Sequence, residues 1–163
     1  MALGDNTTSA ERGSSPRGRQ PYMIQHELDF STAASDKGTA LAAADVIPVL
    51  TIPANTLIMC GGAEVTEAHA GTSTDTAFDI GITGGDVDNF VDGFDFDGAS
   101  VGDYAVKAGQ TPVMVSTSDT VDVLLQAMTG TTTGGKLRIW AICMDVDDQG
   151  TLSADEVDRD TLA

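Results

Sequence analysis

Short runs of alternating apolar and polar residues dominate this chain, and they restrict it to a fold made of β-strands. Residues 22–30 alternate in this way, with apolar side chains on one face and polar ones on the other. The same two-residue period recurs in residues 78–82, 121–127 and 137–143. Gly, Thr and Asp fill the segments between the runs, and no long amphipathic helix is evident. We therefore predict an all-β fold of about seven short strands, arranged as a single β-sandwich or jelly-roll-like domain.

Other segments predict individual elements of this domain. Residues 32–44 favour a short helical turn. Residues 46–52 are apolar, with Pro48 within the run and Pro53 after it, which is typical of an edge strand or an irregular extended run. A longer apolar run at 57–66 is interrupted by a Gly-Gly pair, which predicts a bulge or a sharp bend. The runs at 121–127 and 137–143 follow one another across a Gly-rich loop, and we predict that they form a hairpin.

Residues 83–110 form a Gly- and Asp-rich stretch that is long for a loop within a compact domain. It contains four aromatic side chains, Phe90, Phe94, Phe96 and Tyr104. Aromatic residues in such a segment indicate that it packs against another part of the protein.

The composition indicates one domain with a thin core. A length of 163 residues suits one domain, and the low aromatic content of 5% with 18 Gly indicates many turns. No apolar run is long enough for a transmembrane helix, so we expect no membrane partner. The N-terminus lacks the apolar segment of a secretory signal, and export by that route is not expected. Cys60 and Cys143 lie in apolar runs and are expected to be buried, reduced thiols.

Charge divides the chain into an arm, a body and a tail. Residues 1–21 form an extended basic arm with Arg12, Arg17 and Arg19, and after Met1 its only large apolar side chain is Leu3. Such a segment cannot offset its own ordering entropy, so we expect it to be disordered in isolation and to become ordered against a partner surface. The body (22–146) and the acidic tail (147–163) are strongly negative: residues 21–163 carry five basic and 23 acidic side chains. A protein this acidic repels nucleic acid, which we exclude as a partner.

The sharpest local motif is an acidic stretch at residues 145–156, DVDDQGTLSADE. It matches a twelve-residue EF-hand loop at several positions, with the candidate calcium ligands Asp145, Asp147, Gln149, Thr151 and Glu156. An EF-hand loop follows a helix, however, whereas this one follows a predicted strand, and Gln at its fifth position departs from the pattern. Two interpretations stay open, a calcium-binding β module and a solvated acidic tail without a cofactor.

Three further motifs give weaker indications of a chemical function. Five carboxylates, Asp86, Asp88, Asp92, Asp95 and Asp97, could gather around a divalent cation or could form a solvated, self-repelling loop. His26 lies on the apolar face of its predicted strand, which favours a core or interface histidine over a metal ligand. The pattern GASVG at 98–102 fits a nucleophile elbow by letter, but that motif requires an α/β sheet around Ser100. We predict that the protein is not an enzyme.

Most of residues 1–146 resembles the small structural proteins of tailed-bacteriophage virions, above all capsid decoration (cement) proteins. The likeness is carried by the start MALGDNTTSA with RGRQ, by VIPVLTIPANTLIMCGGAEVTEA and TAFDIGITGGDVDNFVDG, and by the ending TPVMVSTSDTVDVLLQAMTGTTTGGKLRIWAICMDV. The acidic stretch at 145–156 is not part of the resemblance.

The resemblance implies a β-rich protein, often a homotrimer, that binds the major capsid protein on the capsid exterior after synthesis in the host cytoplasm. An arm can add a strand to a neighbour's sheet or lie in a groove between subunits. We therefore expect partner contacts at the end of the arm, from Arg12, Arg17, Arg19, Gln20 and Tyr22. The alternative within the same class is a tail, fibre or collar component.

Overall fold

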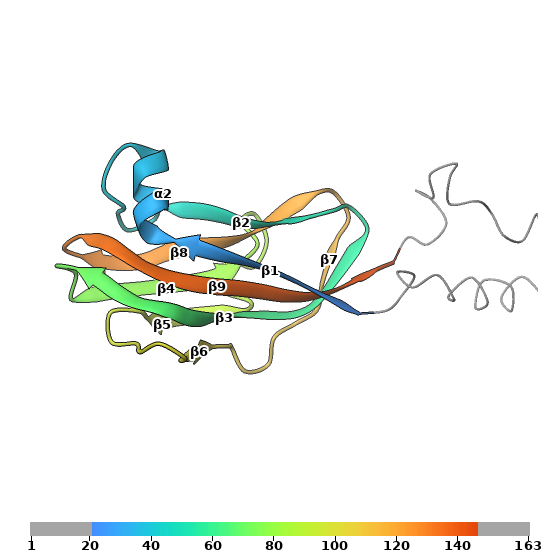
Figure 1. Cartoon of the computed structure of the whole chain (residues 1–163). Coiled ribbons are helices and arrows are strands. Elements are labelled where there is room, and N and C mark those ends of the chain that lie inside the picture. Colours follow the sequence, from blue (N-terminus) through green and yellow to red (C-terminus); the bar gives the residue numbers. More distant parts are fainter. Residues whose placement is uncertain (1–20, 147–163) are drawn as a thin grey trace, which may run out of the picture.

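The computed structural model describes residues 21–146, which form ten elements (Figure 1). The first five are β1 (Tyr22–Asp29), α2 (Phe30–Lys37), β2 (Val46–Ile52), β3 (Thr56–Gly71) and β4 (Asp75–Gly81). The others are β5 (Val91–Asp95), β6 (Tyr104–Ala105), β7 (Val113–Val115), β8 (Asp119–Thr129) and β9 (Thr132–Asp145). The predicted all-β fold is confirmed. Within this range no helix is long and apolar enough to span a membrane.

The strands form two antiparallel sheets that pack face to face as a sandwich. Sheet A has the order β1-β9-β3-β6, with β7 also paired to β3, and sheet B has the order β2-β8-β4-β5. The chain crosses between the sheets at almost every connection, and only β4–β5 and β6–β7 follow one another within one sheet. This strand order is that of a jelly roll. β2 lies at the edge of sheet B, as its prolines predict, and its register shifts between Pro48 and Leu50.

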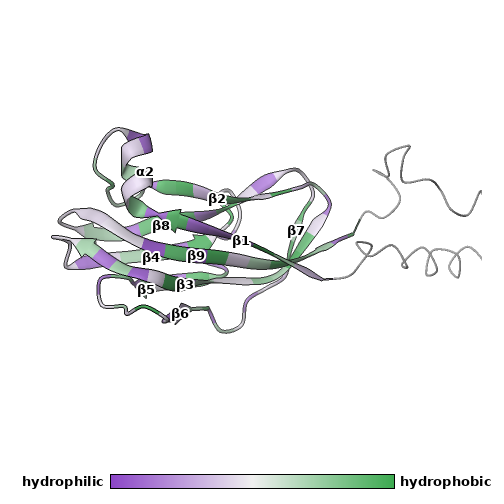
Figure 2. Cartoon of the chain, in the orientation of Figure 1, coloured by the Kyte–Doolittle hydropathy of each residue, from purple (hydrophilic) through white to green (hydrophobic). Residues whose placement is uncertain are grey.

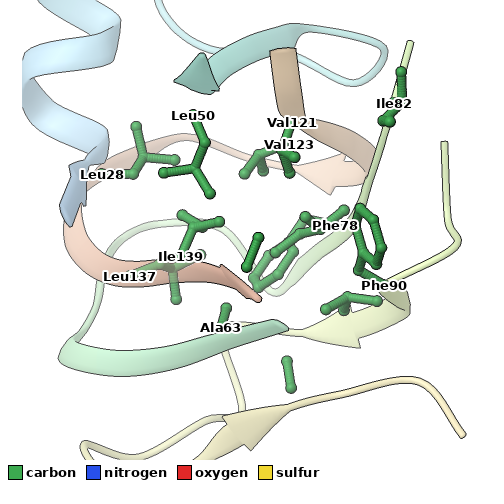
Figure 3. Close-up of a cluster of buried hydrophobic side chains, with 14 of the residues drawn as sticks. Leu28, Leu50, Ala63, Phe78, Ile82, Phe90, Val121, Val123, Leu137 and Ile139 are labelled. Carbon is green, nitrogen blue, oxygen red and sulfur yellow. The ribbon is translucent and has the colours of Figure 1, made fainter. Parts of the chain in front are cut away.

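The core fills the space between the two sheets (Figure 3). Sheet A contributes inward-facing aliphatic side chains such as Leu137 and Ile139, and sheet B contributes Val121, Val123 and Phe78. Alternate residues of both inner faces are buried, as the two-residue period requires. Figure 2 colours each residue by its hydropathy, and hydrophobic (green) and hydrophilic (purple) residues alternate along several of the strands.

A single helix closes one end of this core. Asp29 ends β1 and caps α2, because its carboxylate accepts hydrogen bonds from the backbone N–H groups of Ser31 and Thr32. Gly38 ends the helix in the left-handed conformation. Phe30, the first helical residue, is fully buried. The predicted helical turn at 32–44 therefore exists, but it begins two residues earlier and ends at Lys37.

The Gly- and Asp-rich stretch is part of the core, as its aromatic residues predict. Phe90 and Phe96 are fully buried, and the Phe96 ring lies 5.0 Å from that of Phe30. Gly135 allows this contact, because a Cβ atom there would lie 2.7 Å from the Phe96 ring. Tyr104, by contrast, is 64% exposed.

Two side-chain amides fasten this stretch to the sandwich. Gln110 accepts a hydrogen bond from the Gly61 N–H and donates to the carbonyl oxygens of Gly61 and Phe90. Asn89 exchanges two hydrogen bonds with the backbone of Thr111, at 2.7 and 3.0 Å. Satisfied amide pairs of this kind replace the backbone ladder that an irregular segment lacks.

The predicted hairpin of the last two long runs is wrong. β8 pairs with β2 and β4 in sheet B, whereas β9 pairs with β1 and β3 in sheet A. The chain passes from one sheet to the other near Gly130, whose φ is 98° and which packs against the backbone of Thr72. Alternation shows that each strand buries one face, but it does not show which strand lies beside it.

We predict that Phe96→Ala lowers the free energy of unfolding by about 3–5 kcal/mol, because it leaves a cavity where three aromatic rings meet. Tyr104→Ala is the matched control from the same stretch, and we expect it to change stability by less than about 0.5 kcal/mol. Chemical denaturation at one fixed protein concentration measures both. Equal, small effects would show that residues 83–110 are not part of the core.

Candidate attachment end and outer face of sheet A

The first residue of β1 and the last residue of β9 are joined at the end of the sandwich opposite α2 (Figure 1). The Tyr22 hydroxyl donates a hydrogen bond of 2.6 Å to Oδ1 of Asp145. The two strands are antiparallel, with Tyr22 opposite Cys143 and Asp29 opposite Lys136. The segments before Tyr22 and after Asp145 therefore join the body side by side.

Burial and the neighbouring carboxylate both act on the Tyr22 phenol. The pKa of Tyr22 is raised to about 12. Partial burial is the largest cause, followed by the hydrogen bond to Asp145 and by the negative charge of the Asp145 carboxylate. Each of these effects disfavours the phenolate. The phenol therefore stays a hydrogen-bond donor throughout the neutral range.

Of the residues predicted for the arm contacts and for the calcium loop, the structure describes only Tyr22 and Asp145, and it brings those two together. The arm residues Arg12, Arg17, Arg19 and Gln20 lie outside the described residues, as do the candidate ligands Asp147, Gln149, Thr151 and Glu156. Asp145 itself lies at the end of a strand and has one carboxylate oxygen engaged by Tyr22. The calcium site therefore stays a prediction, in which calcium would have to use the other oxygen or displace the phenol.

The five carboxylates of the Asp-rich stretch do not converge on one point. Lys107 forms ion pairs with Asp88 at 3.1 Å and Asp92 at 3.6 Å. Asp86 and Asp88 compete for one proton: the pKa of Asp88 is lowered, first by hydrogen bonding to the protonated Asp86 carboxyl and then by Lys107, and the pKa of Asp86 is raised. Asp95 and Asp97 instead accept hydrogen bonds from backbone N–H groups, those of Gly98 and Thr76. Within residues 21–146 no three metal-binding side chains come together, so these carboxylates shape loops and pair with a lysine.

The histidine and cysteine predictions have mixed outcomes. His26 is exposed on β1, an edge strand of sheet A. Of its two expected positions the core is therefore wrong, and the interface position stays a prediction. Cys143 is buried as predicted, and burial is the main cause that raises its pKa to about 11. Cys60 is only half-buried. Both thiols are free, because the register places Cys143 on the inner face of sheet A and Cys60 on the outer face.

The GASVG motif lies in an exposed loop between β5 and β6. The Ser100 N–H donates to the Asp103 carboxylate, which closes a turn. A nucleophile elbow requires a strand before the serine, a helix after it and a parallel sheet around it. The described residues contain only antiparallel pairs and the single helix α2, so the motif lacks its structural context.

Charged residues cover one half of the outer face of sheet A. At the end near α2, Arg138 of β9 contacts Glu64 of β3 at 2.9 Å. One row further along, Lys136 lies between Asp29 and Glu67, at 3.7 and 3.5 Å. These side chains alternate with buried ones, so this half is an ordinary solvent-facing sheet surface.

The other half of the same face, nearer Tyr22 and Asp145, is apolar. The register places six side chains there in adjoining rows: Met23, Leu57, Met114, Trp140, Ile142 and Met144. We call this set the apolar half of sheet A. Sequence reasoning missed it, although a signal was present. Residues 139–144, IWAICM, are apolar without interruption, which is typical of a strand covered on both faces.

Comparison with known proteins finds similarity at the level of the fold. No protein-family model matches the chain, and no curated protein matches it. A chain in the solved capsid of Ralstonia phage GP4 aligns with a TM-score of 0.57 and 15% identity, over 84% of this chain and 89% of that chain. A chain in the Cyanophage Pam1 capsid asymmetric unit aligns with a TM-score of 0.53 and 14% identity, over 78% of this chain and 86% of that chain. The sandwich is therefore a fold that occurs in phage capsids.

We predict that stability declines as the pH rises from 10 to about 12, and that Tyr22→Phe reduces this decline. The folded state holds the phenolic proton up to about pH 12, whereas the unfolded chain releases it near the ordinary pKa of 10.0. The contribution of Tyr22 is thus complete below pH 10 and is lost toward pH 12. Thermal unfolding at several pH values measures the slope, and Asp145→Asn should shift the tyrosinate absorbance change to lower pH. An unchanged slope in Tyr22→Phe would contradict the assignment.

Proposed function

We propose that this chain is a structural protein of a tailed-bacteriophage virion, which binds the exterior of the assembled capsid as a decoration (cement) protein. The observation that carries the proposal is the jelly-roll sandwich, shared over most of its length with chains of two phage capsids. The sequence resemblance to decoration proteins supports the same class. The capsid chains favour a place on the capsid over one in a tail, fibre or collar.

Attachment through the N-terminal arm is supported by the way in which β1 is held. Tyr22, which donates a hydrogen bond to Asp145, lies just after the arm. The arm residues proposed as contacts precede it by ten residues or fewer: Arg12, Arg17, Arg19 and Gln20. Behind Tyr22, all eight residues of β1 pair with β9 in a continuous register. A force along the arm therefore loads this ladder parallel to the strands, so that many hydrogen bonds share it. The arm is also the only net basic part of a chain whose overall charge is −17.

The proposed partner is the major capsid protein, and the proposed state is a homo-oligomer, with a trimer favoured. Each copy contributes one arm, and binding by one arm raises the effective concentration of the others at the lattice. A small contact per arm is then sufficient for stable attachment. The acidic body, with four basic and 17 acidic side chains in residues 21–146, would face solvent and discourage contact between particles.

We predict that deletion of residues 1–20 weakens co-sedimentation with capsids by about 100-fold or more, because the multivalent arms are lost. Deletion of residues 147–163 is the matched control and should leave binding unchanged. Replacing Arg12, Arg17 and Arg19 with Gln should weaken binding less, and mainly at low salt.

Capsids that lack this protein are the binding partner in this experiment, and a quantitative gel of complete virions gives the copy number. Hundreds of copies per particle support decoration, whereas a few copies indicate a tail, fibre or collar component. Full binding by the shortened chain would show that the arm is not the point of attachment.

A further inference from the structure

The apolar half of sheet A is exposed to an extent that the fold does not require. Met23 is 56% exposed and Met114 is 47% exposed, and both lie in the same rows as Ile142 and Met144 of the central strand β9. Val106 beside these rows is 53% exposed. Large exposed apolar patches are uncommon on monomeric proteins and mark contact surfaces. The charged half of the same face shows what a purely solvent-facing surface of this sheet looks like.

Local packing holds two of the side chains on this face close to the sheet. A Cβ atom on Gly62 would lie 2.9 Å from Val106 and 3.0 Å from the Trp140 indole, so both side chains lie over the glycine. The indole is thereby held against the sheet, and the next row of the outer face carries Met23 and Ile142. Methionine adapts its shape to an opposing surface, and tryptophan is enriched where protein contacts contribute most energy.

We infer that the apolar half of sheet A is the contact between copies of this chain. The charge distribution restricts the part of the body that a second copy could contact. Two bodies with four basic and 17 acidic side chains each repel one another, so a contact between them needs a face without charges. The six side chains of the apolar half carry none, and the ion pairs of Arg138 and Lys136 lie in the other half.

The position of the surface relative to the chain ends is consistent with this occupant. Met23 is adjacent to Tyr22, where the 20-residue arm joins the body. A rotation axis that runs along the strands would bring the apolar halves together and place the arms of all copies at one end. The inference deepens the proposed function, since it rests on the homo-oligomer proposed there and names the surface that forms it.

The first test is the mass of the free protein in solution, measured by light scattering over a dilution series without capsids. We expect the wild-type protein to have a multiple of the chain mass of 16.8 kDa. Met23→Glu with Met114→Glu should reduce it to a single chain. Val46→Glu is the matched control, because Val46 is a 41% exposed strand residue of sheet B, and it should keep the wild-type mass.

The second test uses the unaltered protein and therefore does not depend on the folding of a variant. Trp140 is the only tryptophan, so its fluorescence emission reports directly on this surface. On dilution to single chains, the emission should shift to longer wavelength, and the half-buried Cys60 thiol should react faster with a maleimide. Emission and labelling rates that stay constant while the mass falls would overturn the inference.

Other outcomes separate this inference from the proposed function. A wild-type protein that is a single chain at every concentration overturns the inference, and so does a doubly substituted protein with wild-type mass. If that variant keeps its mass but loses capsid binding, the surface contacts the capsid and not a second copy. Deletion of residues 1–20 should leave the number of chains per particle unchanged, and a drop to single chains would show that the arms hold the copies together.

Discussion

The pairing of β3 with β9 is the constraint on which the rest of the structure depends. These two strands, of 16 and 14 residues, are the longest within residues 21–146 and lie side by side from Thr56 opposite Asp145 to Gly71 opposite Thr132. Their inward-facing side chains form one side of the core, while their outward-facing side chains contribute to both the charged half and the apolar half of sheet A. β1 and the short strands β6 and β7 are added at their edges.

The same pairing fixes where the chain can act on other molecules. Because β9 runs antiparallel to β1, its last residue returns to the first residue of β1, and Tyr22 meets Asp145 there. The helix, the aromatic cluster around Phe96 and the ion pairs of Lys136 occupy the opposite end. One end of the described sandwich is thus closed by packing, whereas the other end carries the Tyr22–Asp145 hydrogen bond and the apolar half of sheet A. The proposed attachment to a capsid lattice uses this difference between the two ends.

Sequence reasoning located most strands and assigned their inner faces, since a two-residue period directly reports one-sided burial. It also recognised that Phe90 and Phe96 must pack, although it could not show how Gln110 and Asn89 hold that stretch against the sandwich. The hairpin of β8 and β9 was wrong, because neighbours in sequence are not always neighbours in a sheet. The exposure of His26 was not predicted for a related reason: only the tertiary structure reveals that β1 is an edge strand.

The sequence by itself determined the all-β class, the edge strand with its prolines and the contrast between the basic residues 1–20 and the acidic remainder of the chain. These properties depend on local period, on composition and on charge, which one chain displays directly. Only the tertiary structure decided which strands share a sheet, that Tyr22 binds Asp145, and that the apolar residues of four strands form one surface. Those features join residues that lie far apart in the chain, and their contacts are set by the folding of the whole sandwich.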